Sequence, residues 1–380
     1  MSLTCRAAVL RELGCPKPYA ESRPLAIEIV HLEGPRASEL VVKVIAAGLC
    51  HSDLSIINGS RGRDVPMVMG HEGAGEVVEV GAAVNDIKVG DHVSFQFSVS
   101  CGRCANCQGG RPQICEVAPI ARVKGELVGG GSRLRDEAGT VLHHQAGVSC
   151  FAEYSVVDRG SVVRIDKSMP LEKAAVFGCA VMTGVGAVIN TAKVSPGQSV
   201  AIFGLGGVGL SGVMGAKLSG AETIIAVDIN QQKFEKATAL GATHCLNAAD
   251  PEIVEKIKDL TYGGVDYAFD YAGVIPALKS AYASVKRGGA VITAGLSAAG
   301  NQFSFEQGDL VSNEKSILGS YMGSCVPVRD IPRFIGLYQR GLLPVDYILD
   351  GSMGLDDINR GFDMLDSGAV VRQLVLPHMG

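Results

Sequence analysis

The stretch SVAIFGLGGVGLSGVMGAKLSGAETIIAVD, residues 199–228, joins two short apolar runs through a glycine-rich turn. The first run ends at Phe203, the glycines begin at Gly204, and the second run ends at Asp228. A buried strand, a Gly-x-Gly-x-x-Gly turn, a helix and a second strand ending in an acid form the context in which this motif binds a dinucleotide. The stretch therefore predicts a dinucleotide-binding βαβ unit.

Each part of this motif has its own task. The first glycine permits the tight turn, the second lets backbone N–H groups approach the pyrophosphate, and the third allows close packing of helix on strand. A carboxylate at Asp228 would accept hydrogen bonds from the adenosine ribose and repel a 2′-phosphate, which favours NAD over NADP. The predicted cofactor-binding residues of the motif are Gly204, Gly206, Gly207, Val208, Gly209 and Asp228.

Apolar runs and helical stretches continue to alternate after this motif. The runs are YAFDYAG at 267–273, AVITAG at 290–295 and SILGS at 316–320. A helix is expected over 231–240, because its apolar residues share one face and Gly241 can cap its end. Such alternation predicts an α/β fold with a doubly wound parallel sheet.

The chain before this region has a different pattern of apolar residues and glycines. Runs rich in β-branched residues, at 41–45, 75–80 and 92–97, are separated by glycine turns and predict a compact, mostly β domain. The final GAVVRQLVLP, residues 368–377, resembles one more strand and is expected to rejoin that domain. The predicted domains are 1–180 with 326–380, mostly β, and 181–325, which binds the nucleotide.

Composition narrows the class of protein. A chain of 380 residues exceeds the usual span of one domain, and its net charge of -5 argues against a nucleic-acid-binding surface. The sequence reads as having no apolar run near 18 residues and no signal peptide, so a cytoplasmic protein without a membrane partner is expected. Eleven cysteines, four of them within 101–115, suit metal binding better than disulfides.

Those four are Cys101, Cys104, Cys107 and Cys115. Two-residue gaps let successive thiolates face one tetrahedral centre, and four sulfurs leave no open position, so a zinc there would be structural. Cysteine spacing alone does not choose the metal, so an iron–sulfur cluster stays open as an alternative. Four free buried cysteines are the remaining interpretation.

A second set of metal-ligand residues lies in CHSD at 50–53, GHEG at 70–73 and GC at 178–179. Thiolates with an imidazole favour zinc, and three such ligands leave one position for a substrate. Taken alone, each motif more often marks an ordinary packed residue than a metal ligand. Their combination with the four-cysteine lobe and the nucleotide motif indicates a catalytic metal centre.

GHEGAGEVVEVG at 70–81, the cysteine lobe and residues 201–230 resemble zinc-containing medium-chain alcohol dehydrogenases of the long classical type. The resemblance covers nearly the whole chain. It implies a GroES-like catalytic domain and a Rossmann domain, with one catalytic zinc, one structural zinc and NAD per chain. It also implies reversible oxidation of a primary, aromatic or secondary alcohol to an aldehyde or ketone.

The resemblance assigns the metal residues by motif. Cys50, His71 and Cys179 match the ligands of the catalytic zinc, and Glu72 matches a carboxylate behind it. Asp53 matches an acid that orients the ligand histidine, an arrangement that tunes metal affinity.

The resemblance also assigns residues to the cofactor and the proton. His51 and Arg372 match basic contacts to the pyrophosphate, and Lys233 matches a lysine beside the ribose. Ser52 matches the hydroxyl that relays the alcohol proton. Many members end this relay at a histidine where this chain has Ser55, so His51 or direct release to water is expected to take its place.

The substrate pocket is assigned by alignment to Phe97, Ile120, Leu296 and Tyr321, each of which could instead be a core residue. Gln145 and Ala146 stand where the family has bulkier apolar side chains, so a roomier, partly polar pocket is expected.

Two other functions stay open. A glutathione-dependent formaldehyde dehydrogenase ranks second, because Pro119 replaces the arginine that holds the glutathione carboxylate in that subtype. A non-catalytic zinc- and NAD-binding sensor is the other. The long stretch between Cys115 and His143 resembles that of dimeric members and predicts a homodimer.

Overall fold

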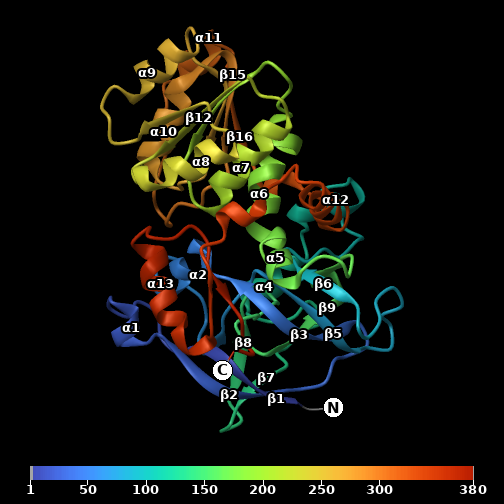
Figure 1. Cartoon of the computed structure of the whole chain (residues 1–380). Helices are drawn as coiled ribbons and strands as arrows, with labels where there is room; N and C mark the ends of the chain where they lie inside the picture. Colours follow the sequence, from blue (N-terminus) through green and yellow to red (C-terminus); the bar gives the residue numbers. More distant parts are fainter. Residues whose placement is uncertain (1–2, 380) are drawn as a thin grey trace. The chain divides into compact units, whose positions relative to one another are not determined.

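The computed structural model describes residues 3–379 and divides the chain into two compact units (Figure 1). The first unit takes the chain up to Cys179, then Val326–Gly336 and the tail from Leu349. The second unit takes Ala180–Cys325 and Leu337–Ile348. The predicted ranges placed residues 337–348 in the first domain, and the contacts place them in the second unit instead.

The second unit is built on six parallel strands in the order β13-β12-β11-β14-β15-β16. The strands are β11 (Ser199–Phe203), β12 (Thr223–Asp228), β13 (His244–Asn247), β14 (Val265–Asp270), β15 (Val285–Thr293) and β16 (Ser316–Gly319). The order reverses between β11 and β14, where such sheets bind ligands at the carboxyl ends of the strands. The predicted doubly wound sheet is confirmed, with β13 as a strand that the sequence did not single out.

Helices cover both faces of this sheet. Phe203 packs in one cluster with Ile257 of α9 and Leu278 of α10, whereas Ile202, whose side chain points to the opposite face, is also fully buried. The expected helix over 231–240 forms as a short 3-10 turn followed by α8, which ends at Gly241 with φ 117°. The helices are α6 (Met182–Gly186), α7 (Gly207–Leu218), α8 (Phe234–Leu240), α9 (Ile253–Leu260), α10 (Ile275–Ser284) and α11 (Gln307–Ser312).

The first unit is mostly β, as predicted. A closed barrel has the order β1-β2-β7-β8-β4, and a second sheet has the order β10-β6-β5-β3-β18-β17, with β9 paired to β3. The strands are β1 (Leu3–Leu10), β2 (Leu25–Leu32), β3 (Glu39–Gly48), β4 (Met67–Val68), β5 (Gly73–Val80), β6 (His92–Phe95), β7 (Leu134–Asp136), β8 (Val141–His144), β9 (Tyr154–Asp158), β10 (Val162–Arg164), β17 (Ser352–Met353) and β18 (Leu374–Val375).

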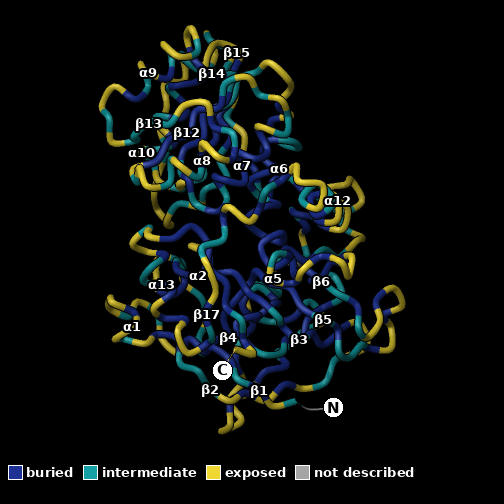
Figure 2. Tube along the Cα trace, in the orientation of Figure 1, coloured by how far each residue is buried: buried dark blue, intermediate teal, exposed yellow. Residues whose placement is uncertain are grey.

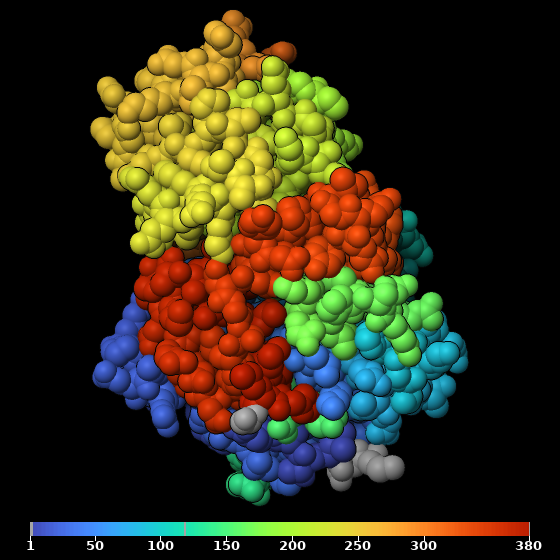
Figure 3. All heavy atoms as spheres, viewed as in Figure 1, coloured from blue at the N-terminus to red at the C-terminus, as the bar shows by residue number. Residues whose placement is uncertain are grey.

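The C-terminal tail rejoins the first unit, as expected. Leu374 of β18 lies opposite Gly48 of β3 in an antiparallel pair, and Figure 3 shows C-terminal atoms beside N-terminal ones. The expected strand is only two residues long. The helices that begin in this unit are α1 (Tyr19–Ser22), α2 (His51–Ile57), α3 (Ala105–Gln108), α4 (Ala118–Val123), α5 (Leu171–Ala174), α12 (Pro327–Gln339) and α13 (Ile358–Asp366).

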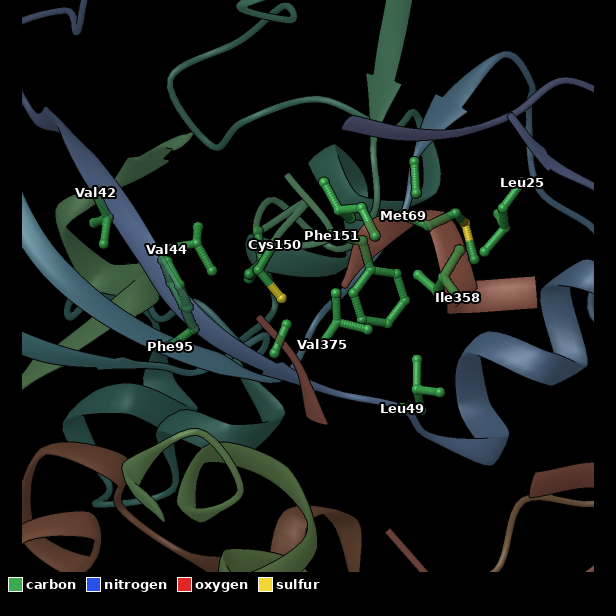
Figure 4. Packing of buried hydrophobic residues seen from close by; sticks show 14 of the residues in the cluster. Leu25, Val42, Val44, Leu49, Met69, Phe95, Cys150, Phe151, Ile358 and Val375 are labelled. Atoms are coloured by element: carbon green, nitrogen blue, oxygen red, sulfur yellow. The ribbon is translucent and has the colours of Figure 1, made fainter. Parts of the chain in front are cut away.

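The core of the first unit holds the segments that carry the metal-ligand residues. Side chains from β3 and β6, among them Val44 and Phe95, pack in one cluster with Phe151 and with Val375 of the tail (Figure 4). The segments that follow β3 (49–50) and precede β5 (67–72) are buried, whereas exposed residues occur near the opposite ends of both strands (Figure 2). The strand ends that carry the metal-ligand residues therefore lie in the buried interior of this unit.

One expectation needs a correction. The helical run Leu171–Ala192 is long and apolar enough to cross a membrane, although the sequence was read as having no such segment. In the structure, 83% of the most apolar 18-residue stretch of this run is buried. Burial in the core therefore accounts for its apolar character.

Candidate active site

Cys50 sits at the junction of β3 and α2, where the backbone holds its thiol in place. It caps α2, because its sulfur accepts a hydrogen bond from Ser52 N at 3.5 Å and its own N–H donates to Asp53 Oδ2 at 3.2 Å. The Cys179 thiol donates to this sulfur and, with the Arg372 charge, holds the pKa of Cys50 well below its usual value. These contacts favour the thiolate form of Cys50, which is the form that binds metals.

Four metal-ligand side chains converge in the first unit. One donor atom each from Cys50, His71, Glu72 and Cys179 lies within 4.8 Å of the others, and all four residues are buried. Cys179 Sγ is 3.5 Å from His71 Nε2. Tetrahedral zinc with ordinary Zn–S and Zn–N bonds would separate these atoms by about 3.6 Å. The predicted ligands therefore come together at a spacing that fits one zinc ion.

Asp53 orients the ligand histidine. Its Oδ1 lies 2.6 Å from His71 Nδ1, which leaves Nε2 of the ring facing the two thiols. Burial alone would lower the pKa of His71, but the Asp53 carboxylate and the Cys50 sulfur together raise that pKa well above its usual value. The structure places Asp53 where the sequence put it, behind the histidine.

Glu72 and Arg372 form a buried ion pair at the edge of this cluster. Arg372 Nη1 lies 3.0 Å from Glu72 Oε2 and donates to the Leu49 carbonyl at 2.6 Å. Both side chains are at most 4% exposed. Sequence reasoning treated Glu72 and Arg372 separately, and it missed that they pair.

The cysteine lobe also gathers its four thiols. The sulfurs of Cys101, Cys104, Cys107 and Cys115 lie within 4.8 Å of one another, and Cys104 Sγ is 3.9 Å from Cys115 Sγ. The edge of a ZnS4 tetrahedron is about 3.8 Å. Backbone N–H groups of Glu116 and Cys107 donate to Cys104 and lower its pKa to about 6. This spacing fits a metal ion held by four thiolates.

In the second unit, the glycine motif shapes the turn between β11 and α7. Gly204 has φ 92°, and a side chain on it would meet Ala272 N at 2.8 Å. A side chain on Gly209 would lie 1.7 Å from the Gly204 carbonyl. Only open space lies within 4 Å of the corresponding position on Gly206. The glycine expected to face the pyrophosphate thus borders open space, directly before Gly207 and Val208 at the start of α7.

Asp228 ends β12 beside this turn. Its carboxylate accepts hydrogen bonds from Leu205 N at 2.6 Å and Asn230 N at 2.8 Å. Lys233 Nζ lies 3.5 Å from the same carboxylate. The structure therefore brings together the predicted ribose-binding pair, Asp228 and Lys233, at the carboxyl end of the sheet.

The predicted relay residues lie on α2. Ser52 is half-buried one residue after the exposed His51. Ser55 Oγ donates to the His51 carbonyl at 2.8 Å, so this hydroxyl is occupied within the helix.

The predicted pocket residues divide between the two units. Phe97 meets the His71 ring edge-on at 5.1 Å and lines a small hollow with Ala121 and Ala146. Ile120 is 62% exposed and Leu296 58% exposed, which excludes the alternative that they are core residues. Tyr321 begins the 3-10 turn η6 (Tyr321–Ser324) of the second unit and is half-buried.

Gln145 is the clearest error of the sequence reasoning. It was expected to make the pocket partly polar, but it is 4% exposed and its amide bonds to Asp53 and to the backbone of Gly70. A buried amide needs hydrogen-bond partners, and these partners come from segments distant in the sequence, so no local pattern marked them.

Comparisons with known proteins agree with this site. Residues 36–167 match the alcohol dehydrogenase GroES-like domain, and residues 207–340 match the zinc-binding dehydrogenase family. S-(hydroxymethyl)glutathione dehydrogenase of Paracoccus denitrificans is 37% identical, over 98% of this chain and 99% of that protein.

Two solved structures are also similar over nearly their full lengths. Benzyl alcohol dehydrogenase of Acinetobacter calcoaceticus has a TM-score of 0.91 and 32% identity, over 98% of this chain and 99% of that one. A putative zinc-binding dehydrogenase from Sinorhizobium meliloti 1021, bound to NADP, has a TM-score of 0.79 and 28% identity, over 99% and 100%. With its two metal-ligand clusters and its glycine-rich nucleotide turn, the chain belongs to the zinc-containing medium-chain alcohol dehydrogenase family.

Proposed function

We propose that this protein is an NAD-linked alcohol dehydrogenase that oxidises a primary, aromatic or secondary alcohol, reversibly, by hydride transfer. The convergence of Cys50, His71 and Cys179 at zinc spacing carries the proposal. Two thiolates and one imidazole leave a tetrahedral zinc one position for a substrate oxygen. Bound there, zinc would act as a Lewis acid that makes the alcohol proton easier to remove.

Residues of α2 would move that proton. Ser52 lies two residues after Cys50, and its hydroxyl can accept a proton from the alcohol and pass one on. The exposed His51 next to it gives access to solvent. Because Ser55 already donates to a backbone carbonyl, we assign the outer end of the relay to His51 or to water.

We propose NAD as the preferred cofactor. Asp228 places a carboxylate beside the nucleotide turn, where it would repel a 2′-phosphate. Lys233, 3.5 Å from Asp228, offsets part of that charge, so both NAD and NADP belong in the assay. Arg372 and His51 remain proposed contacts to the pyrophosphate.

An aromatic or aliphatic alcohol is the favoured substrate. Phe97 places an aromatic ring 5.1 Å from that of His71, and Ala146 lines the same small hollow as Phe97. Oxidation of a glutathione adduct is the second candidate, favoured by the 37% identity to the Paracoccus enzyme. Pro119 at the position of the glutathione-binding arginine speaks against it. A panel of benzylic, primary and secondary alcohols and formaldehyde, with and without glutathione, separates the two.

The test of the reaction is Cys50→Ala, assayed by NADH absorbance and by metal analysis. We expect turnover to disappear while NAD affinity stays unchanged, because the variant removes one zinc ligand. Cys150→Ala is the matched control: Cys150 is buried in the same unit, and its thiol donates to the Glu72 carbonyl. Activity retained in Cys50→Ala would refute the ligand role. A wild-type protein that holds zinc and NAD without oxidising any alcohol would instead be the sensor.

We further propose that the cysteine lobe holds a structural zinc. Four thiolate ligands enclose the ion, whereas the catalytic zinc keeps an open position, so the two should differ in lability. Mild chelation is expected to remove one zinc together with the activity and to leave the other bound. Iron and acid-labile sulfide in the purified protein would point to an iron–sulfur cluster instead, and loss of both zincs in one step would contradict the assignment.

Finally, we propose a cytoplasmic homodimer without nucleic-acid or membrane partners. The length of the 115–143 segment supports the dimer, and light scattering of the purified protein tests it.

A further inference from the structure

Gln145 follows β8 and is held at four points. Its Nε2 donates to Asp53 Oδ1 at 2.6 Å, and its Oε1 accepts the backbone N–H of Gly70. Its own N–H donates to Ser149 Oγ at 3.0 Å and to the Val68 carbonyl at 3.3 Å. Only one orientation of the amide satisfies both Asp53 and Gly70, so the side chain is fixed.

The Asp53 carboxylate connects this amide to two metal-ligand residues. Oδ1 meets both Gln145 Nε2 and His71 Nδ1 at 2.6 Å, and Oδ2 accepts the Cys50 N–H at 3.2 Å. Gly70, bonded to the other end of the amide, directly precedes His71. A closed ring of contacts therefore runs from Gln145 through Asp53 to His71 and back through Gly70.

We propose that Gln145 is a positioning residue for the metal centre: it fixes the direction of the Asp53 carboxylate, and through it the ring of His71. The inference rests on the metal site of the proposed function. Gln145 would not touch substrate or metal. It acts by holding Asp53, the hydrogen-bond partner of a metal ligand, in place. Mutation of such partners typically changes metal affinity by about 10- to 100-fold.

The chemistry of an amide suits this position. A carboxylate in its place would put a second negative charge against Asp53 and would not donate to it. An apolar side chain would leave the Gly70 N–H and one lone pair of Asp53 buried without this partner, and the carboxylate would be free to turn. A shorter amide, as in asparagine, lacks the one methylene needed to span Asp53 and Gly70.

The experiment compares Gln145→Met and Gln145→Asn with the wild-type holoenzyme. Zinc affinity of each site is measured by competition with a chelator, with the cysteine lobe as internal reference. Cobalt is then substituted at the catalytic site, and its absorption spectrum reports ligand geometry. We expect about tenfold weaker zinc binding at the catalytic site and a shifted cobalt spectrum, with lobe affinity unchanged.

Gln96→Met is the matched control. Gln96 is also a buried glutamine of the first unit, but its amide bonds to the Gly160 carbonyl and the Ser98 N–H. Its loss should lower stability without changing zinc affinity. Wild-type affinity and spectrum in either folded Gln145 variant would overturn the inference, as would equal losses at both metal sites. If the wild-type Cys50 cluster fails to bind zinc at all, the proposed function fails instead.

Discussion

Replacement of Arg372 by methionine tests the buried ion pair beside the metal cluster. The change removes the guanidinium that lies 3.0 Å from Glu72 Oε2 and leaves that carboxylate buried without this partner. At an effective dielectric constant of about 20, two unit charges at this distance attract by ~5 to 6 kcal/mol. Breaking one side of a buried pair costs ~3 to 5 kcal/mol, because the remaining charge is not solvated.

We therefore expect Arg372→Met to lower the free energy of unfolding by ~3 to 5 kcal/mol. Thermal unfolding of the zinc-saturated protein, at fixed protein concentration and scan rate, provides the measurement. Arg360→Met is the matched control, because Arg360 and its partner Asp357 are 66% and 52% exposed. Such a surface pair contributes under ~1 kcal/mol. The double variant Glu72→Gln/Arg372→Met should regain most of the loss, since neither charge then remains.

Two results would refute this reasoning. One is a loss in Arg372→Met no larger than that in Arg360→Met. The other is a double variant as unstable as the single one, which would show that lost packing, and not the loss of the charge opposite Glu72, causes the effect.

The other predictions concern the nucleotide and acid stability. Asp228→Asn removes the charge that would repel a 2′-phosphate, and two unit charges about 4 Å apart in water interact by ~1 kcal/mol, so NADP should gain roughly fivefold in affinity relative to NAD. Fluorescence titration with both cofactors measures this ratio, and an unchanged ratio would exclude the role of Asp228. Burial, then the Arg133 charge, lowers the pKa of His144 to about 3. On acidification, His144 takes up its proton at a higher pH in the unfolded chain than in the folded chain. The free energy of unfolding therefore falls as the pH drops from about 6.5 toward 3, by up to ~1.4 kcal/mol per pH unit. His144→Gln, which keeps an acceptor for the Arg133 N–H, should lose less stability on acidification in urea titrations, and parallel losses would contradict this.

Sequence reasoning succeeded where spacing along the chain dictates geometry. The Gly204 turn, the end of α8 at Gly241 and the four-cysteine lobe are local patterns, so backbone sterics and ligand spacing determine them. The fold class followed from the alternation of apolar runs. β13 escaped notice because His244–Asn247 is short and at most half-buried, and so lacks the apolar run that marks a central strand.

Sequence reasoning did not predict the direction in which side chains point. The alignment with the family put Gln145 at a position in the sequence close to the substrate pocket. In the structure, however, its amide points toward Asp53. Sequence reasoning also missed the pairing of Arg372 with Glu72, which depends on β18 lying beside β3. The contact of Arg372 with the pyrophosphate stays a prediction. Contacts between segments that are hundreds of residues apart cannot be read from local pattern.

The division of the chain makes these roles separable. Every residue of the two metal clusters belongs to the first unit, and the glycine turn with Asp228 belongs to the second. Variants of Cys50 or Gln145 should therefore change metal affinity without changing NAD affinity, and Asp228→Asn should do the reverse. Arg372 is the exception, because it pairs with Glu72 and is also the proposed pyrophosphate contact. If both roles hold, the single variant Arg372→Met should both weaken NAD binding and lower stability. Adding Glu72→Gln to it should restore stability but not NAD binding.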